Sequence, residues 1–129
     1  MKTVLFACVH NAGRSQMAAA FFNHLADVKL ARAISAGTHP ADHVHPEVVA
    51  AMREVGIELT DAHPQKLTEE LARGVDLLVT MGCGEECPYV PGVKVIDWPL
   101  ADPKGKDMDA VRAIRDEVKR LVQVLVGEL

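Results

Sequence analysis

Long hydrophobic segments are absent from this sequence. Near its start, residues 4–9 form an apolar run that is too short for a signal peptide core and far too short to span a bilayer. We therefore expect no membrane contact and a cytoplasmic location. Runs of Lys or Arg are also absent and the formal net charge is −4, so the sequence indicates no nucleic-acid partner.

Aromatic residues and cysteines are scarce as well. One Trp, one Tyr and three Phe leave few side chains from which to build an aromatic substrate slot. Three cysteines argue against a structural disulfide framework, and an odd number in a reducing compartment favours catalysis, redox cycling or metal binding. The alternative is that each cysteine is a small buried hydrophobic residue.

The pattern of apolar residues predicts an α/β fold. With 129 residues, 49% of them hydrophobic, the chain can form one core, and we expect a single domain over residues 1–129 and a monomer. Buried strands are predicted at residues 2–7, 31–35, 75–80 and 93–96. Helices are predicted at residues 14–26, between Pro46 and Gly56, between Thr68 and Gly74, and at residues 107–126. This alternation predicts a four-stranded parallel sheet with helices on both faces, which binds ligands beyond the carboxyl ends of its strands.

The stretch between the first strand and the first helix predicts an anion site. Cys8 is followed after five residues by Arg14 and then Ser15. Backbone N–H groups and the positive end of the helix favour a tetrahedral oxyanion and the nucleophilic thiolate form of Cys8. Arg14 can hold two oxygens with its planar guanidinium, and Ser15 can donate a hydrogen bond to the thiolate. The predicted oxyanion-binding residues are Val9, His10, Asn11, Ala12, Gly13, Arg14 and Ser15. The alternative is that Cys8 merely ends a strand and Arg14 lies in solvent.

An acidic residue after the last strand is a candidate general acid. Asp102 precedes Pro103, which favours an extended backbone at Asp102 and helps to direct its side chain. A carboxylic acid folded over the loop could protonate a leaving oxygen. Equally, Asp102 could open a turn, as Asp before Pro often does. Asp97 is a weaker candidate for the same role.

Two cysteines four positions apart lie in a Gly-flanked segment after the third strand. Cys83 and Cys87 can bond to each other if this segment bends, and a chain of thiol–disulfide exchanges becomes possible if Cys83 also reaches Cys8. A zinc site would need four ligands, and the neighbouring sequence supplies neither a His nor a fourth Cys, so we predict no metal site. The alternative is two unrelated loop cysteines.

Together these motifs resemble those of the thioredoxin-coupled arsenate reductases, which share their fold with low-molecular-weight protein tyrosine phosphatases. The resemblance covers almost the whole chain: the Cys8 to Arg14 loop with Ser15-Gln16-Met17-Ala18, then Ser35-Ala36-Gly37-Thr38, Val79-Thr80-Met81-Gly82-Cys83, Cys87-Pro88, Asp97-Trp98 and Asp102-Pro103.

The resemblance implies a reaction and a role for each catalytic residue. Cys8 attacks arsenate held by the loop and Arg14, and Asp102 protonates the departing oxygen. Cys83 then attacks Cys8, which releases arsenite, and Cys87 attacks Cys83 to form a disulfide that thioredoxin reduces. Arsenic detoxification without a bound cofactor is the implied function, with phosphate or sulfate as competing anions.

The sequence departs from this family at a few positions, and two other functions stay open. Ala19 stands where many relatives carry a Glu that in some helps to bind potassium, so the sequence leaves a potassium site open, and His10 replaces a small residue. A phosphatase could use the same loop, but Lys104-Gly105-Lys106 stand where tyrosine phosphatases of this fold place aromatic residues. A metalloid sensor could use the three thiols. In that case His39, His43 and His45 would add a metal patch, although we interpret them as exposed loop residues.

Overall fold

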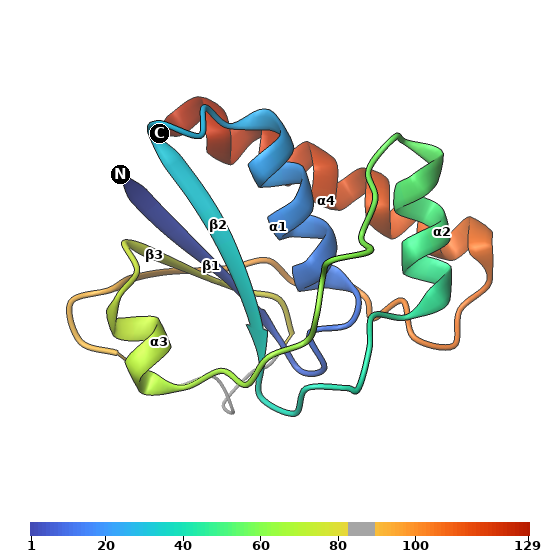
Figure 1. Ribbon diagram of the computed structural model, residues 1–129, viewed down its shortest axis with the longest axis horizontal. Coiled ribbons are helices and arrows are strands. Elements are labelled where there is room, and N and C mark those ends of the chain that lie inside the picture. The colour runs from blue at the N-terminus through green and yellow to red at the C-terminus, as the bar shows by residue number, and fades with distance from the viewer. Residues whose placement is uncertain (83–89) are drawn as a thin grey trace.

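A four-stranded parallel sheet organises the chain. The structure, a computed structural model, describes residues 1–82 and 90–129. In these residues the elements are β1 (Lys2–Cys8), α1 (Arg14–Leu25), β2 (Ala31–Gly37), α2 (Pro46–Glu54), α3 (Glu69–Arg73), β3 (Leu77–Thr80), β4 (Lys94–Asp97) and α4 (Met108–Glu128). The strands are parallel and lie in the order β2-β1-β3-β4. The predicted α/β fold is confirmed (Figure 1).

Helices cover both faces of the sheet, as predicted. Side chains of a strand alternate between its faces, and β1 shows this clearly. Val4 and Phe6 pack into a cluster with residues of α1, α2 and α4, whereas Leu5 and Ala7 pack into a second cluster with Ala72 of α3. Figure 1 shows α1 and α4 on one side of the sheet and α3 on the other. Because β1 is apolar on both faces, its end is held firmly where the predicted anion site begins.

The helix starts differ in how their first amides are capped. Thr68 caps α3 by accepting a hydrogen bond from Leu71 N at 3.1 Å, and Asp107 caps α4 by accepting one from Ala110 N at 2.9 Å. The residue before α1 is Gly13, which has no side chain to act as a cap. Within the described residues no side chain caps the first amides of α1, which can therefore bind an anion.

The structure differs from the sequence prediction at the third strand, which begins at Leu77 rather than at residue 75. Val75 still belongs to the turn that follows α3, because its amide donates to Ala72 O at 3.4 Å. In the described part of the chain, no helix is both long enough and apolar enough to cross a membrane.

An ion-pair cluster joins α2 to α4. Glu54 accepts from Arg112 and from Arg115, each at 2.8 Å, and Arg115 also donates to Ala51 O at 2.9 Å. The hydrogen bonds from Arg112, followed by those from Arg115, lower the pKa of Glu54 to about 2. Because the pKa of the folded state lies below that of the unfolded state, this pair stabilises the fold above about pH 4.5.

We expect the stabilisation by Glu54 to disappear as the pH falls from about 4.5 to about 2, since in that range the unfolded state binds a proton at Glu54 that the folded state does not. Glu54→Gln should lower the melting temperature at pH 7 and leave it close to that of the wild type near pH 2. Thermal unfolding across this pH range measures the difference. Glu69→Gln, which removes an exposed pair with Arg73 inside α3, is the matched control and should change little. A pH-independent loss in Glu54→Gln would contradict this explanation.

Candidate active site

The carboxyl ends of the strands meet at one edge of the sheet. In the register of the strands Cys8 pairs with Gly37, Ala7 pairs with Thr80, and Thr80 pairs with Asp97. The segments that follow the four described strands therefore start side by side. Ligands of parallel α/β sheets bind at this edge.

The loop of residues 8–13 is held from outside through its carbonyl oxygens. Each of these carbonyls accepts a hydrogen bond, and the donors are Thr38 N (3.1 Å to Cys8 O), His39 N (2.8 Å to Val9 O), Ala41 N (2.9 Å to His10 O), Gln16 Nε2 (3.0 Å to Asn11 O), His45 N (3.0 Å to Ala12 O) and Met17 N (3.0 Å to Gly13 O). The amides of residues 9–13 donate to no group in the described part of the chain. With the carbonyls bound outside, these N–H groups are available to an oxyanion inside the loop.

Asn11 braces the loop from within. Its φ is 51°, in the left-handed region that Asn tolerates better than most residues. The fully buried side chain donates from Nδ2 to Ser15 Oγ at 2.7 Å and accepts from Gln65 N at 3.0 Å. Both polar atoms of the Asn11 side chain thus form hydrogen bonds, and these bonds connect the loop to the start of α1 and to the segment before α3.

Cys8 lies at the start of the loop beside a directed hydroxyl. Its side chain is buried, and Cys8 Sγ lies 2.8 Å from Ser15 Oγ. Ser15 Oγ already accepts from Asn11 Nδ2, so its own proton is free to point at the sulfur. The hydroxyl can therefore donate a hydrogen bond to the sulfur of Cys8, the candidate nucleophile.

Arg14 is buried where the loop passes into α1. Its Nη1 donates to Leu100 O at 3.0 Å, and its Nη2 lies 3.7 Å from Asp102 Oδ2. The Arg14 side chain is only 7% exposed, whereas that of Asp102 is 42% exposed. Arg14 therefore does not lie in solvent, and a buried guanidinium beside the anion loop suits a multiply charged anion.

The segment after β4 folds over the loop. Pro103 is buried, and its Cγ lies so near Gly13 that a Cβ built there would be 2.7 Å away. Asp102 lies beside Arg14 and also accepts from Lys104 N at 3.0 Å, so it opens a turn as well as facing the site. Asp97 instead accepts from Thr80 Oγ1 at 2.7 Å at the ends of β3 and β4. The geometry favours Asp102 over Asp97 as the acid.

Several contributing groups could not be singled out from the sequence, because they act through their backbone. Gln65 N and Leu100 O are peptide groups whose role depends only on where the chain passes. Gly37 gives a weak signal: a Cβ there would lie 2.6 Å from Val9 O and 2.8 Å from Asn11 N, so only glycine allows β2 to approach the loop this closely.

The predicted thiols Cys83 and Cys87 lie outside the described residues, in the segment 83–89. The described chain reaches Gly82 beside the guanidinium of Arg14 and resumes at Val90, which is buried in the second hydrophobic cluster. The attachment point of Cys83 is therefore adjacent to the anion loop.

The histidines near the loop are exposed or half-buried. His39 and His43 are exposed, while His45 is half-buried and precedes α2, where its amide donates to the loop. His10 Nδ1 lies 3.2 Å from His39 O, and because a carbonyl only accepts, Nδ1 carries the proton. Among residues 1–82 and 90–129, no group of three or more His, Cys, Asp and Glu side chains is placed to hold a metal ion.

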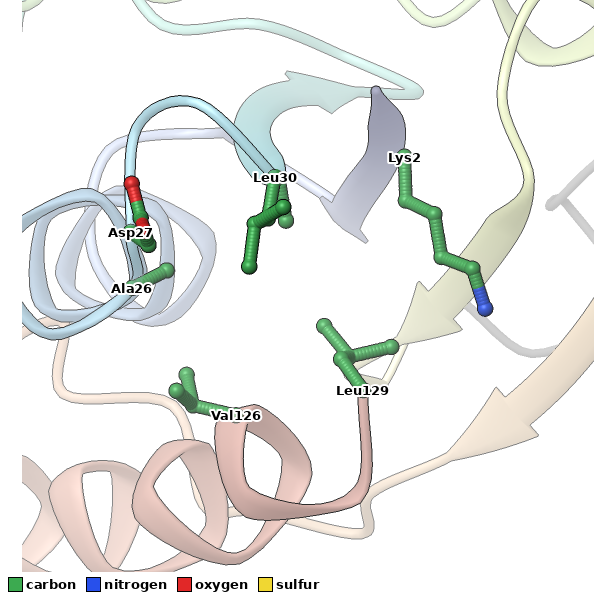
Figure 2. Close-up of a pocket in the computed structure, with 7 residues that line it drawn as sticks. Lys2, Ala26, Asp27, Leu30, Val126 and Leu129 are labelled. Carbon is green, nitrogen blue, oxygen red and sulfur yellow. The ribbon is translucent and has the colours of Figure 1, made fainter.

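A pocket of about 390 Å³ lies at the opposite edge of the sheet (Figure 2). Lys2 at the start of β1, Asp27 and Leu30 before β2, and Val126 and Leu129 at the end of the chain line it. The loop of Cys8 lies beyond the other end of β1, so this pocket is separate from the candidate active site.

A buried cysteine at the start of this loop, with a buried arginine at the start of the following helix, is the arrangement expected of an oxyanion-binding site with a cysteine nucleophile. Residues 3–129 match the family model described as low molecular weight phosphotyrosine protein phosphatase. Arsenate reductase 1 of Bacillus cereus is 36% identical over 121 residues, which cover 91% of this chain and 88% of that protein. The chain therefore belongs to the low molecular weight phosphotyrosine protein phosphatase family and is similar to arsenate reductases within it.

Solved structures support the same relationship. A thioredoxin-dependent arsenate reductase of Corynebacterium glutamicum matches with a TM-score of 0.86 and 39% identity, over 99% of this chain but only 61% of that longer chain. An arsenate reductase in the phosphate binding state matches with a TM-score of 0.85 and 30% identity, over 99% of this chain and 98% of that chain. The resemblance inferred from the sequence motifs is thus confirmed at the level of the family.

Proposed function

We propose that this protein reduces arsenate to arsenite with Cys8 as the nucleophile, and that it serves arsenic detoxification. The observation that carries the proposal is the loop itself: carbonyls bonded to other protein groups, amides that donate to no described group, buried Arg14 and the hydroxyl of Ser15 at the Cys8 sulfur. Arsenate reductases among its relatives support arsenate as the oxyanion that is reduced. Phosphate and sulfate, with similar shape and charge, compete for the same loop.

The first step is displacement of an oxygen from arsenic. Arsenate lies in the loop with its oxygens on the amides of residues 9–15 and on Arg14. The Cys8 thiolate attacks arsenic and forms a sulfur–arsenic bond. The departing oxygen takes a proton from Asp102, which lies beside Arg14, and leaves as water. Pentavalent arsenic is not yet reduced at this stage.

The second stage transfers two electrons through the remaining thiols. Cys83 attacks the Cys8 sulfur, the sulfur–arsenic bond breaks, and its electron pair stays on arsenic, which leaves as trivalent arsenite. Cys87 then attacks Cys83 and releases the Cys8 thiolate, so a Cys83–Cys87 disulfide remains. The dithiol of external thioredoxin reduces this disulfide. The Gly82 contact with Arg14 supports the relay, because it brings the chain to the loop immediately before Cys83.

This relay requires a reducing compartment, so we further propose that the protein acts in the cytoplasm. We also propose that it is a monomer and that it binds no cofactor. Its electrons come from outside, and thioredoxin dependence of the Corynebacterium glutamicum relative supports thioredoxin as their source.

Phosphatase activity is the second candidate function, because the family model and the anion loop fit phosphate esters equally well. The segment after Asp102 argues against a phosphotyrosine substrate. Lys104, Gly105 and Lys106 are all exposed there and offer no aromatic side chain to hold a phenyl ring.

We expect arsenate-dependent oxidation of NADPH in the presence of thioredoxin and thioredoxin reductase, and we expect Cys87→Ser to abolish sustained turnover. The variant should still release one equivalent of arsenite per protein and stop at the Cys8–Cys83 disulfide, because no thiol remains to resolve it. Counting free thiols before and after the addition of arsenate shows whether the variant halts at this disulfide. If the wild type oxidises no NADPH yet hydrolyses an aryl phosphate well, the protein is a phosphatase and the relay is wrong. Sustained turnover by Cys87→Ser would remove Cys87 from the relay.

A further inference from the structure

Gly82 lies against the guanidinium of Arg14. Its backbone has φ of 93°, in the left-handed region, and a Cβ built on it would overlap Arg14 Nη1 and lie 3.3 Å from Arg14 Cζ. The nearest atoms to this Cβ position all belong to that guanidinium. Because Gly82 has no side chain, the Arg14 guanidinium can lie in the space that a Cβ at this position would fill.

The position of Gly82 is fixed by its neighbour. Met81 is fully buried, and its amide donates to Ala7 O at 2.7 Å, one residue before Cys8. Gly82 cannot retreat from Arg14 without breaking this contact between β3 and β1. The guanidinium cannot retreat freely either, because it is buried, donates to Leu100 O and pairs with Asp102. A side chain at position 82 would have to displace the guanidinium.

We propose that Gly82 is a positioning residue for the oxyanion site: by lacking a side chain, it lets Arg14 hold its guanidinium at the loop. It acts through Arg14 and touches no reacting atom. The proposal rests on the proposed function only in that an oxyanion binds in the loop of Cys8, and it does not require that arsenate be reduced.

Backbone strain alone would also make alanine unfavourable at this position, so the two causes must be separated. Two other glycines provide the control. Gly92 has φ of 86° and Gly56 has φ of 82°, and a Cβ on either would meet nothing within 4 Å. Gly92→Ala and Gly56→Ala thus introduce nearly the same strain without a collision.

The test is calorimetric titration with inorganic phosphate, which needs no turnover. Gly82→Ala should weaken phosphate binding about tenfold or more, because a charge-assisted contact is lost. Gly92→Ala and Gly56→Ala should bind within about twofold of the wild type, although all three variants lose stability. Phosphate binding by Gly82→Ala that equals the binding by these controls would overturn the proposal.

A second background shows whether Gly82 acts through Arg14. In Arg14→Ala the guanidinium is gone, so adding Gly82→Ala should change phosphate affinity less than about twofold. The melting temperature of the double variant should lie below that of Arg14→Ala by no more than the decrease that Gly92→Ala causes in the wild type. This comparison can be made even if Gly82→Ala alone fails to fold. A further tenfold loss in the Arg14→Ala background, or no recovery of folding, would show that Gly82 acts by another route. If the wild type binds phosphate but reduces no arsenate, the proposed function fails while this inference stands.

Discussion

Replacing Cys8 by Ser is expected to abolish arsenate reduction while leaving phosphate binding intact. The change exchanges one atom, Sγ for Oγ, in a fully packed position at the end of β1, so the amides and Arg14 stay in place. A neutral hydroxyl can neither attack arsenic effectively nor form a disulfide. It also lacks the negative charge of the thiolate, so phosphate should bind at least as tightly as in the wild type.

Two measurements check this expectation: arsenate-dependent NADPH oxidation, which should fall to the background rate, and phosphate titration by calorimetry. Together they also separate an enzyme from a metalloid sensor. A sensor with three thiol ligands would keep part of its affinity for arsenite after the loss of one, whereas a reductase loses all turnover. Residual turnover in Cys8→Ser would assign the nucleophile to another residue.

The second large effect is expected for Asp102→Asn. An amide cannot give a proton to the departing oxygen, so kcat should fall by about 10²- to 10⁴-fold. Asn keeps the acceptor oxygen that binds Lys104 N, and the side chain is half-buried, so the melting temperature should change little.

Asp97→Asn is the matched control for this experiment, because Asp97 ends the strand that precedes Asp102 but accepts from Thr80 rather than facing Arg14. Its kcat should stay within a few-fold of the wild type. Steady-state kinetics of both variants at saturating arsenate provide the comparison. Equal losses in the two would show that the segment needs its negative charge in general, and Asp102 would lose its role as the acid.

The sheet and the loop could be predicted from the sequence because their signals are local. Buried strands have runs of apolar residues, and the segment from Cys8 to Ser15 carries its chemistry in one continuous stretch. The start of β3 was predicted two residues early, because Val75 is apolar like a strand residue but completes the turn after α3.

The rest of the site depends on contacts between distant peptide groups, which have no residue-type signal. Nothing in the identity of Leu100 or Gln65 indicates that a carbonyl of one binds Arg14 or that an amide of the other binds Asn11. For Asp102 the sequence left an acid and a turn residue as equal alternatives. In the structure one oxygen of Asp102 accepts from Lys104 N in the turn and the other faces Arg14, so the turn is present and the acid role stays a prediction.

The outward bonds of the loop carbonyls have a consequence for selectivity. A loop whose shape is fixed by its own protein partners loses little conformational freedom when an anion arrives, and it recognises charge and tetrahedral shape alone. Arsenate and phosphate are nearly equivalent by those criteria, so affinity cannot separate them. Under the proposed relay the distinction is kinetic: both anions enter, but attack of Cys83 on the Cys8 sulfur releases arsenic with the bonding electron pair as trivalent arsenite, whereas phosphorus has no comparable trivalent leaving form. Phosphate is then a reversible occupant, and only arsenate commits the thiols.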